Sequence, residues 1–304
     1  MTLNMQTFDA ALKQHYTDDR VKNLVYKNNP FLAILPKMES FGGKNLPIPI
    51  QYGVPGSRSA TFASALAQKP GASSAFKDFV LTRAKDYCLA SIDNETLEAS
   101  IGNPNAFMEA AANEINSAIL ACTRSLSTAL FRDGSGAIGV AAAGTAASLV
   151  NLATPADIVN FEVGMTIVST AVAATLPVIG TAVIATIDRD TGSFTTVAPH
   201  GMAINEVLTP QGDFSLTLGG GLKVSGLGAW VPDAPPLAAA FFGVDRTADT
   251  TRLGGVRVVG SGGGAKIADL TRASARLARE GGRPSHCFMN HEDYGGLLEE
   301  LNAK

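Results

Sequence analysis

A glycine-rich stretch near the C-terminus has the spacing of a dinucleotide-binding turn. The run Val256-Arg-Val-Val259 precedes Gly260-Ser-Gly-Gly-Gly-Ala265, and a helical pattern follows. Glycines at this spacing would let a pyrophosphate approach the backbone N–H groups at a helix N-terminus. The next strand-like run, His286–Met289, ends without an acidic residue for a ribose, and no further α/β alternation follows. We therefore interpret Gly260–Ala265 as a glycine hinge, and keep a nucleotide-binding oxidoreductase as the alternative function.

Potential metal ligands or nucleophiles gather just after this helix. They are His286, Cys287, His291, Glu292 and Asp293. A strand would send His286 and Cys287 to opposite faces, whereas a closed zinc site needs paired ligands at tighter spacing. A Cys-His-Asp nucleophile finds no neighbouring group that marks an oxyanion site. We interpret the set as a buried cysteine beside solvent-facing polar groups, and expect no catalytic, cofactor-binding or metal-binding residues and no cofactor.

Three arginines recur three or four residues apart in the same helical pattern: Arg272, Arg276 and Arg279. This spacing puts them on one face of a helix. The formal net charge of the chain is −3, so it carries no overall basic field for sequence-specific nucleic-acid recognition. We expect the row to be either a solvated stripe or a row of ion pairs between subunits, and contact with packaged nucleic acid is the less favoured alternative.

Composition indicates a chain with much surface facing other protein. Hydrophobic residues make up 46% of the sequence and charged residues only 17%, against a typical ~25%. The three cysteines, Cys88, Cys122 and Cys287, have no CxxC spacing and indicate buried thiols in a reducing compartment. The first twenty residues contain no apolar run of a secretory signal. The run 168–187 is interrupted by Pro177 and Gly180, which favours strands over a membrane span.

The longest helical pattern of the chain runs from Asn103 to Gly134, roughly 40 Å at 1.5 Å per residue. Asn103 can cap the first turn and Pro104 suits the first helical position. Its apolar stripe, rich in alanine, is formed by Phe107, Ala111, Ile115, Ala118, Cys122, Leu126 and Ala129. We expect Phe107, Ile115, Cys122 and Leu126 to face a sheet, and Leu126→Asp to abolish folding.

The segments before this helix look too extended and too polar to form a core alone. Residues 3–28 form an amphipathic pattern that needs a surface to lie on, and Phe31–Leu35 is a short apolar plug. Residues 45–51 alternate as a strand with two prolines, which indicates an edge strand or an extended arm. Residues 52–75 are rich in Gly and Ser, with Phe62 and Leu66 as isolated apolar points, and alternation resumes over 76–92. We expect this excursion either to be ordered by something outside the subunit or to be a mobile lid.

Residues 141–221 change to short β-rich runs separated by Gly, Pro and Asp. The expected strands are Ile158–Phe161, Met165–Ser169, Ala182–Ile187, Ser193–Val197 and Phe214–Leu218. A turn at Asp188–Gly192 joins two of them. This spacing predicts a small barrel or sandwich inserted into a different fold. After a proline-rich linker at 231–236, residues 253–259, 265–280 and 286–289 predict a strand, a helix and a buried strand.

Four consecutive segments carry a family resemblance. They read NNPFLAILPKMESFGGKNLPIPIQYG, SATFASALA, FVLTRAKDYCLASIDNETLEAS and the long helix ending LFRDGSGAIG. In this order they resemble the major capsid proteins of tailed bacteriophages with the HK97-type fold, over most of residues 1–140 and weakly over 225–304. The resemblance implies an α+β, HK97-like capsid fold with an N-terminal arm, an E-loop hairpin, a long spine helix, and peripheral and axial domains, into which the small β-barrel or sandwich is inserted.

The resemblance also implies a domain organisation. It runs as an N-terminal arm (1–40), an E-loop-like extended hairpin (41–92), the spine helix and start of the peripheral domain (93–140), the inserted β-rich domain (141–221), the peripheral return and linker (222–263), and an axial domain (264–304). The family usually continues with further strands beyond such an axial domain, so either this variant is short or its C-terminal part is not included in the sequence.

The implied function is structural and not enzymatic. The chain would self-assemble into hexamers and pentamers of an icosahedral shell in the bacterial host cytoplasm and reside in the virion capsid. Its partners would be further copies of itself, scaffold, portal or decoration proteins, and packaged DNA through non-specific contact, with no membrane. A third hypothesis, an adhesin-like β-rich surface protein, rests on residues 141–221 and requires an export signal.

Overall fold

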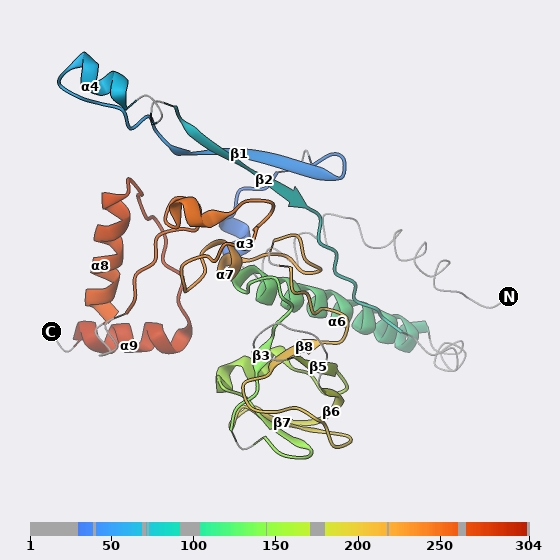
Figure 1. Cartoon of the computed structure of the whole chain (residues 1–304). Helices are drawn as coiled ribbons and strands as arrows, with labels where there is room; N and C mark the ends of the chain where they lie inside the picture. The colour runs from blue at the N-terminus through green and yellow to red at the C-terminus, as the bar shows by residue number, and fades with distance from the viewer. Residues whose placement is uncertain are drawn as a thin grey trace. The chain divides into compact units, whose positions relative to one another are not determined.

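A computed structural model of the chain describes residues 30–38, 41–68, 71, 73–91, 104–143, 145–170, 180–217, 219–260 and 266–302, with side chains of the long helix from Ile115 onward. Within these residues the protein is α+β, with two β-sheets and several helices (Figure 1). The chain divides into two compact units. The first contains the segment up to Phe41, Ala84–Thr217 and Gly221–Gly226, and the second contains Gly42–Arg83, Leu218–Gly220 and Leu227–Lys304.

The predicted long helix is confirmed as α6, Pro104–Phe131, in the first unit. The chain leaves it through Gly134, whose φ of 86° favours glycine. Ile115, Cys122 and Leu126 are half-buried, whereas Thr123 and Leu130 are the deeply buried positions of its described side chains. The buried stripe therefore includes a threonine that hydrophobicity alone does not mark. The predicted burial of Phe107 and the capping by Asn103 lie outside the described residues, as does the expected arm at 3–28.

The apolar plug predicted at residues 31–35 folds as a single helical turn, α3, Pro30–Ile34. The ring of Phe31 packs against that of Phe131 at the end of α6, with centroids 5.1 Å apart. This aromatic contact ties the start of the described chain to the long helix.

The β-rich segment forms a six-stranded antiparallel sheet curled into a half-barrel. Its strands are β3 (Gly139–Val140), β4 (Leu149–Asn151), β5 (Thr166–Thr170), β6 (Gly180–Asp188), β7 (Ser193–Thr196) and β8 (Val207–Pro210), in the spatial order β3-β8-β5-β6-β7-β4. The two edges approach each other, because Ala141 and Leu152 form an isolated bridge. The predicted strands at 165–169, 182–187 and 193–197 and the turn at 188–192 are confirmed.

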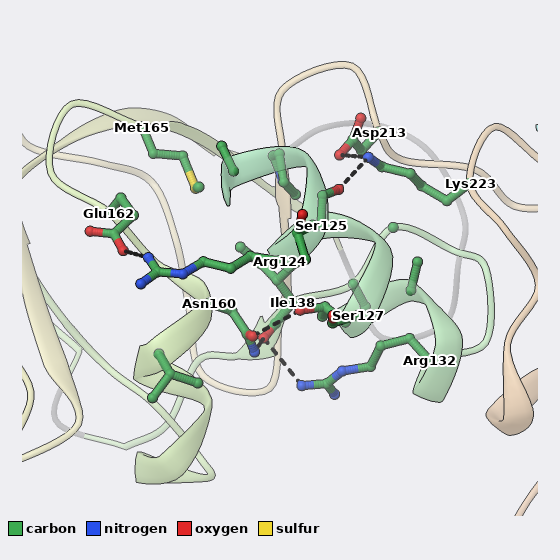
Figure 2. A pocket seen from close by; sticks show the side chains of 18 of the residues that line it. Arg124, Ser125, Ser127, Arg132, Ile138, Asn160, Glu162, Met165, Asp213 and Lys223 are labelled. Atoms are coloured by element: carbon green, nitrogen blue, oxygen red, sulfur yellow. Dashed lines mark hydrogen bonds and ion pairs between the residues drawn. The ribbon is translucent and has the colours of Figure 1, made fainter. Parts of the chain in front are cut away.

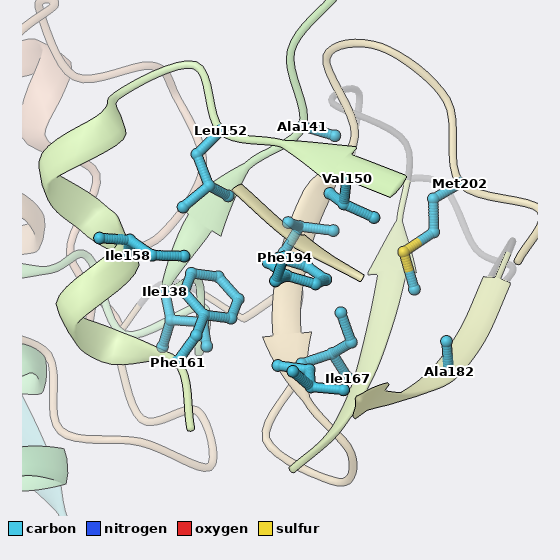
Figure 3. Close-up of a cluster of buried hydrophobic side chains, with 12 residues drawn as sticks. Ile138, Ala141, Val150, Leu152, Ile158, Phe161, Ile167, Ala182, Phe194 and Met202 are labelled. Atoms are coloured by element: carbon cyan, nitrogen blue, oxygen red, sulfur yellow. The ribbon is translucent and has the colours of Figure 1, made fainter. Parts of the chain in front are cut away.

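Inward-facing side chains fill the half-barrel (Figure 3). Phe161 and Phe194 stack at its centre with ring centroids 5.1 Å apart, and both are almost fully buried. The prediction of a strand at 158–161 is wrong, since Pro155–Asn160 is the 3₁₀ helix η2. Ile158 and Phe161 are both buried three residues apart, which is the period of a 3₁₀ turn. Residues 214–217 of the predicted strand 214–218 also form no strand.

The chain enters and leaves the half-barrel at one place. The backbone N–H of Ser215 donates to the carbonyl of Ser135 over 3.0 Å. Beside this bond Gly136 has a φ of 86°, and a Cβ there would lie 2.4 Å from the carbonyl oxygen of Asp213. Only glycine fits this crossing.

In the second unit, two strands form the predicted hairpin, but the second strand ends at Thr82, and residues 83–91 of the predicted alternation form no strand. β1 (Asn45–Gly53) pairs antiparallel with β2 (Ala75–Thr82), and a short helix, α4 (Phe62–Ala67), lies between them. Thr61 caps α4 by accepting a hydrogen bond from the N–H of Ser64. The excursion is thus an ordered two-stranded ribbon, in which the two prolines of β1 are tolerated because each strand has only one neighbour.

The base of the hairpin packs on an aromatic core of the second unit. Phe79 of β2 lies 5.4 Å from Trp230 of α7 (Leu227–Trp230) and 6.3 Å from Phe241, measured between ring centroids. The guanidinium of Arg246, in η3 (Arg246–Asp249), lies over the ring of Phe241 at 4.1 Å and donates to the carbonyl of Ala229. The hairpin is therefore anchored by apolar burial at one end.

The C-terminal part contains α8 (Lys266–Arg279), as predicted, and α9 (His291–Asn302). The strands predicted at 253–259 and 286–289 are wrong. Arg257 donates to the carbonyls of Thr250, Gly254 and Gly255, which holds the first segment in a turn. Residues 286–289 are exposed rather than buried, and no strand of the described chain pairs with them.

Candidate functional site

An open cavity of about 750 Å³ lies along the C-terminal half of α6, within the first unit (Figure 2). Side chains of α6, of the half-barrel and of residues 223–224 line it. Its charged groups are engaged with one another. Glu162 accepts from Arg124 at 2.6 Å and from Arg189 at 3.2 Å, and Arg132 pairs with Asp157 at 2.6 Å.

The polar groups deeper in the same wall are also paired. The side chain of Asn160 accepts from Thr128 and donates to the carbonyl of Ile138, each at 3.1 Å. These bonds fasten η2 and the start of the half-barrel to α6. Together with the ion pairs around Glu162, these bonds hold the elements of the cavity wall to one another. The acidic and basic side chains described here are therefore paired with each other.

The most buried charge of this region is the ammonium group of Lys223. Its side chain is 11% exposed and lies 2.8 Å from Asp86 and 3.0 Å from Asp213, and it donates to Ser125 of α6 at 3.1 Å. Ser125 in turn donates to Asp86 at 2.5 Å. The cluster joins segments up to 137 residues apart in the chain. It holds the irregular segment around Asp86, α6 and the exit of the half-barrel to one point.

Both pKa values in this cluster favour the ion pair. Burial opposes the charge of Asp86, but the hydrogen bonds from Lys223 and Ser125 outweigh it and lower the pKa of this carboxyl below its usual 3.8. Burial likewise opposes the charge of Lys223, and its bonds to Asp86 and Asp213 still raise the pKa of the ammonium above 10.5. Asp86 and Lys223 therefore stay ionised across the neutral range.

Replacing Lys223 by methionine should lower the free energy of unfolding by about 2 kcal/mol at pH 7, because two partly buried carboxylates lose their counter-charge. The depressed pKa of Asp86 gives stability that is present above pH 3.8 and lost as the pH falls through the folded value. The deficit should shrink below about pH 4, as the carboxylate of Asp86 protonates. Urea unfolding at pH 7 and pH 3 measures both values. Arg189→Met, which removes an exposed ion pair, should change stability by about 0.5 kcal/mol or less.

Two of the three cysteines lie beside this cluster, and the thiol of Cys88 contacts that of Cys122. Burial first, and the neighbouring Cys122 second, raise the pKa of the Cys88 thiol to about 12. All three described cysteines are free, and Cys287 is exposed, which corrects its predicted burial.

We therefore expect iodoacetamide at pH 8 to modify Cys287 well before Cys88, because only the thiolate reacts and only about one part in ten thousand of Cys88 is ionised there. Peptide mass spectrometry over a time course measures the order. Addition of urea should bring the two rates together. Equal rates in the folded protein would contradict the protected state of Cys88.

The residues singled out from the sequence do not converge on a chemical site. Residues 261–265 of the glycine turn lie outside the described chain. Across the residues that the structure describes, no group of three or more His, Cys, Asp or Glu side chains could hold a metal ion. His286 contacts its neighbour Ser285, while Asp293 forms an ion pair with Lys266. The arginine row is present on α8 and exposed.

A different surface stands out at the far end of the hairpin. We call it the tip surface: Val54, Phe62, Leu66 and Phe76, which are 69%, 82%, 55% and 59% exposed. Soluble monomers rarely display clustered apolar side chains of this size unless the surface binds something. The sequence marked Phe62 and Leu66 as isolated apolar points, and the hairpin register adds Phe76, which pairs with Gln51 close to Val54.

Comparisons with known proteins add no relative: no protein-family model, no curated protein and no solved structure matches this chain. None of the helices in the described ranges has both the length and the apolar composition that a membrane span requires.

Proposed function

We propose that this protein is a non-enzymatic structural subunit of an icosahedral bacteriophage shell with an HK97-type fold. The single observation that supports this proposal most is the hairpin. Its base is anchored through Phe79 in the core of its own subunit, while its tip surface exposes apolar side chains that no described part of the same unit covers. A segment built in this way gains stability only when a neighbouring molecule covers the tip.

Other features agree with this proposal. An ordered hairpin precedes a 28-residue helix, and a separate small β-fold follows that helix, which is the order that the resemblance implies. The charged groups around the cavity are paired for structural support, which fits a platform repeated by symmetry. In this function the partners are further copies of the chain, with scaffold, portal or decoration proteins and non-specifically contacted DNA. Assembly takes place in the host cytoplasm, and the product is the virion capsid.

Self-assembly is the test of this function. Purified protein should sediment as capsomers, shells or tubes, and negative-stain microscopy should show closed particles or rings with five- or six-fold symmetry. A strictly monomeric species over a range of concentrations, salts and crowding agents would overturn the proposal. Calorimetric titration with NAD and NADP tests the alternative oxidoreductase, and the capsid function predicts no heat of binding.

A further inference from the structure

The helix pair at the C-terminal end of the described chain lacks a buried core. Neither α8 nor α9 contains a buried residue. Figure 1 shows the two helices meeting at a corner, where Lys266 pairs with Asp293 and the N–H of Ile267 donates to Glu300 over 3.1 Å. Helices of 14 and 12 residues are marginal in water without packing. The pair therefore needs a further surface to rest on.

The outer face of α8 is basic. Arg272, Arg276 and Arg279 lie three or four residues apart and are all exposed. Arg272 contacts Asp269 at 2.5 Å, and Arg279 lies 3.7 Å from Glu280. Arg276, the central member, has no ion pair among the described residues. We call these three residues the arginine row.

The outer face of α9 is acidic and shaped for close approach. Glu292 and Glu299 are seven residues apart, exposed and without an ion pair in the described chain. Gly295 lies between them on the same face, and a Cβ at this position would meet nothing within 4 Å. The other two acids, Asp293 and Glu300, are turned toward α8. Glu292, Gly295 and Glu299 form the glutamate row.

The two rows are equal in length and opposite in charge. The end residues of each row are seven positions apart, or about 10.5 Å along the helix. We propose that the arginine row of one copy binds the glutamate row of the next copy, so that α8 of each subunit lies along α9 of its neighbour. A second copy is the fitting partner because one chain carries both complementary rows on different helices and leaves them unpaired with each other.

Such a contact is head-to-tail, because two different surfaces of identical chains meet. Repeating it produces a closed ring when the rotation closes. This inference rests on the proposed self-assembly and adds to it the side chains that pair subunits, with an association that weakens as salt screens the charges.

Charge reversal tests the pairing. Arg276→Glu and Glu299→Arg should each weaken association at least tenfold in sedimentation velocity at low salt, with unchanged circular dichroism. An equimolar mixture of the two variants should recover association to within about threefold of the wild type, because each variant then offers the charge that the other lacks. Lys85→Glu, an exposed change of the same charge outside both rows, should associate like the wild type.

The outcomes separate this inference from the proposed function. Shells that form unchanged with either variant, or a mixture that fails to recover, would overturn the pairing and leave the shell function standing. Charge-dependent rings or chains that never close into shells would support the pairing and overturn the shell function. A wild type that stays monomeric under all conditions would overturn both.

Discussion

Replacing Phe62 and Leu66 together by serine should abolish shell formation and leave the subunit folded. Both side chains lie more than half exposed on the tip surface, so their loss should change the free energy of unfolding by about 0.5 kcal/mol or less. When a neighbour covers them, each contributes about 1.5–3 kcal/mol. Their joint removal should raise the protein concentration needed for assembly more than a hundredfold.

Light scattering and negative-stain microscopy over a concentration series measure this threshold, and thermal unfolding checks the fold. Gln68→Ser, in the same part of the hairpin, removes length without removing apolar surface and should assemble like the wild type. Normal shells from the Phe62/Leu66 variant would contradict a role for the tip surface in assembly.

Replacing Phe79 by alanine should destabilise the second unit by about 3–5 kcal/mol. Phe79 is 2% exposed, and its ring packs between Trp230 and Phe241. Removing it leaves a cavity at the point where the hairpin is anchored. The hairpin alone cannot compensate, because a two-stranded ribbon is marginally stable in water.

Trp230 is the only tryptophan in the chain, so its fluorescence reports on this core directly. The emission of the variant should shift to longer wavelength, and its denaturation midpoint should fall. Phe76→Ala provides the matched control, since Phe76 lies on the same strand three residues earlier and is 59% exposed. An unaltered fluorescence midpoint in Phe79→Ala would contradict the anchoring of the hairpin.

Local patterns were sufficient to predict several elements. The marked ends of α6, the alternation of β1 and the Asp188–Gly192 turn each follow from residues close in sequence, and the structure contains all three. The predictions failed where a short apolar run fitted more than one structure. Residues 256–259 alternate like a strand, but Arg257 satisfies the carbonyls of a turn instead.

The Lys223 cluster could not be predicted from the sequence. Its partners Asp86, Ser125 and Asp213 are spread over much of the chain, and no spacing rule connects them. The tip surface was partly predictable, because the long excursion with isolated apolar residues pointed to an external partner. Which of its residues lie together depends on the register of β1 and β2. This register brings Val54 and Phe76 to the same end of the hairpin.

The chain enters and leaves the half-barrel at neighbouring residues, so this part of the first unit can be exchanged at one place in the sequence. Ser135 and Ser215 are hydrogen-bonded neighbours, so a short linker between them would bridge the gap left by deleting 136–214. A foreign domain whose termini lie equally close could take the same place. Each subunit would then carry one copy of a chosen cargo, while Arg124, Thr128 and Arg132 of α6 would lose their partners Glu162, Asn160 and Asp157.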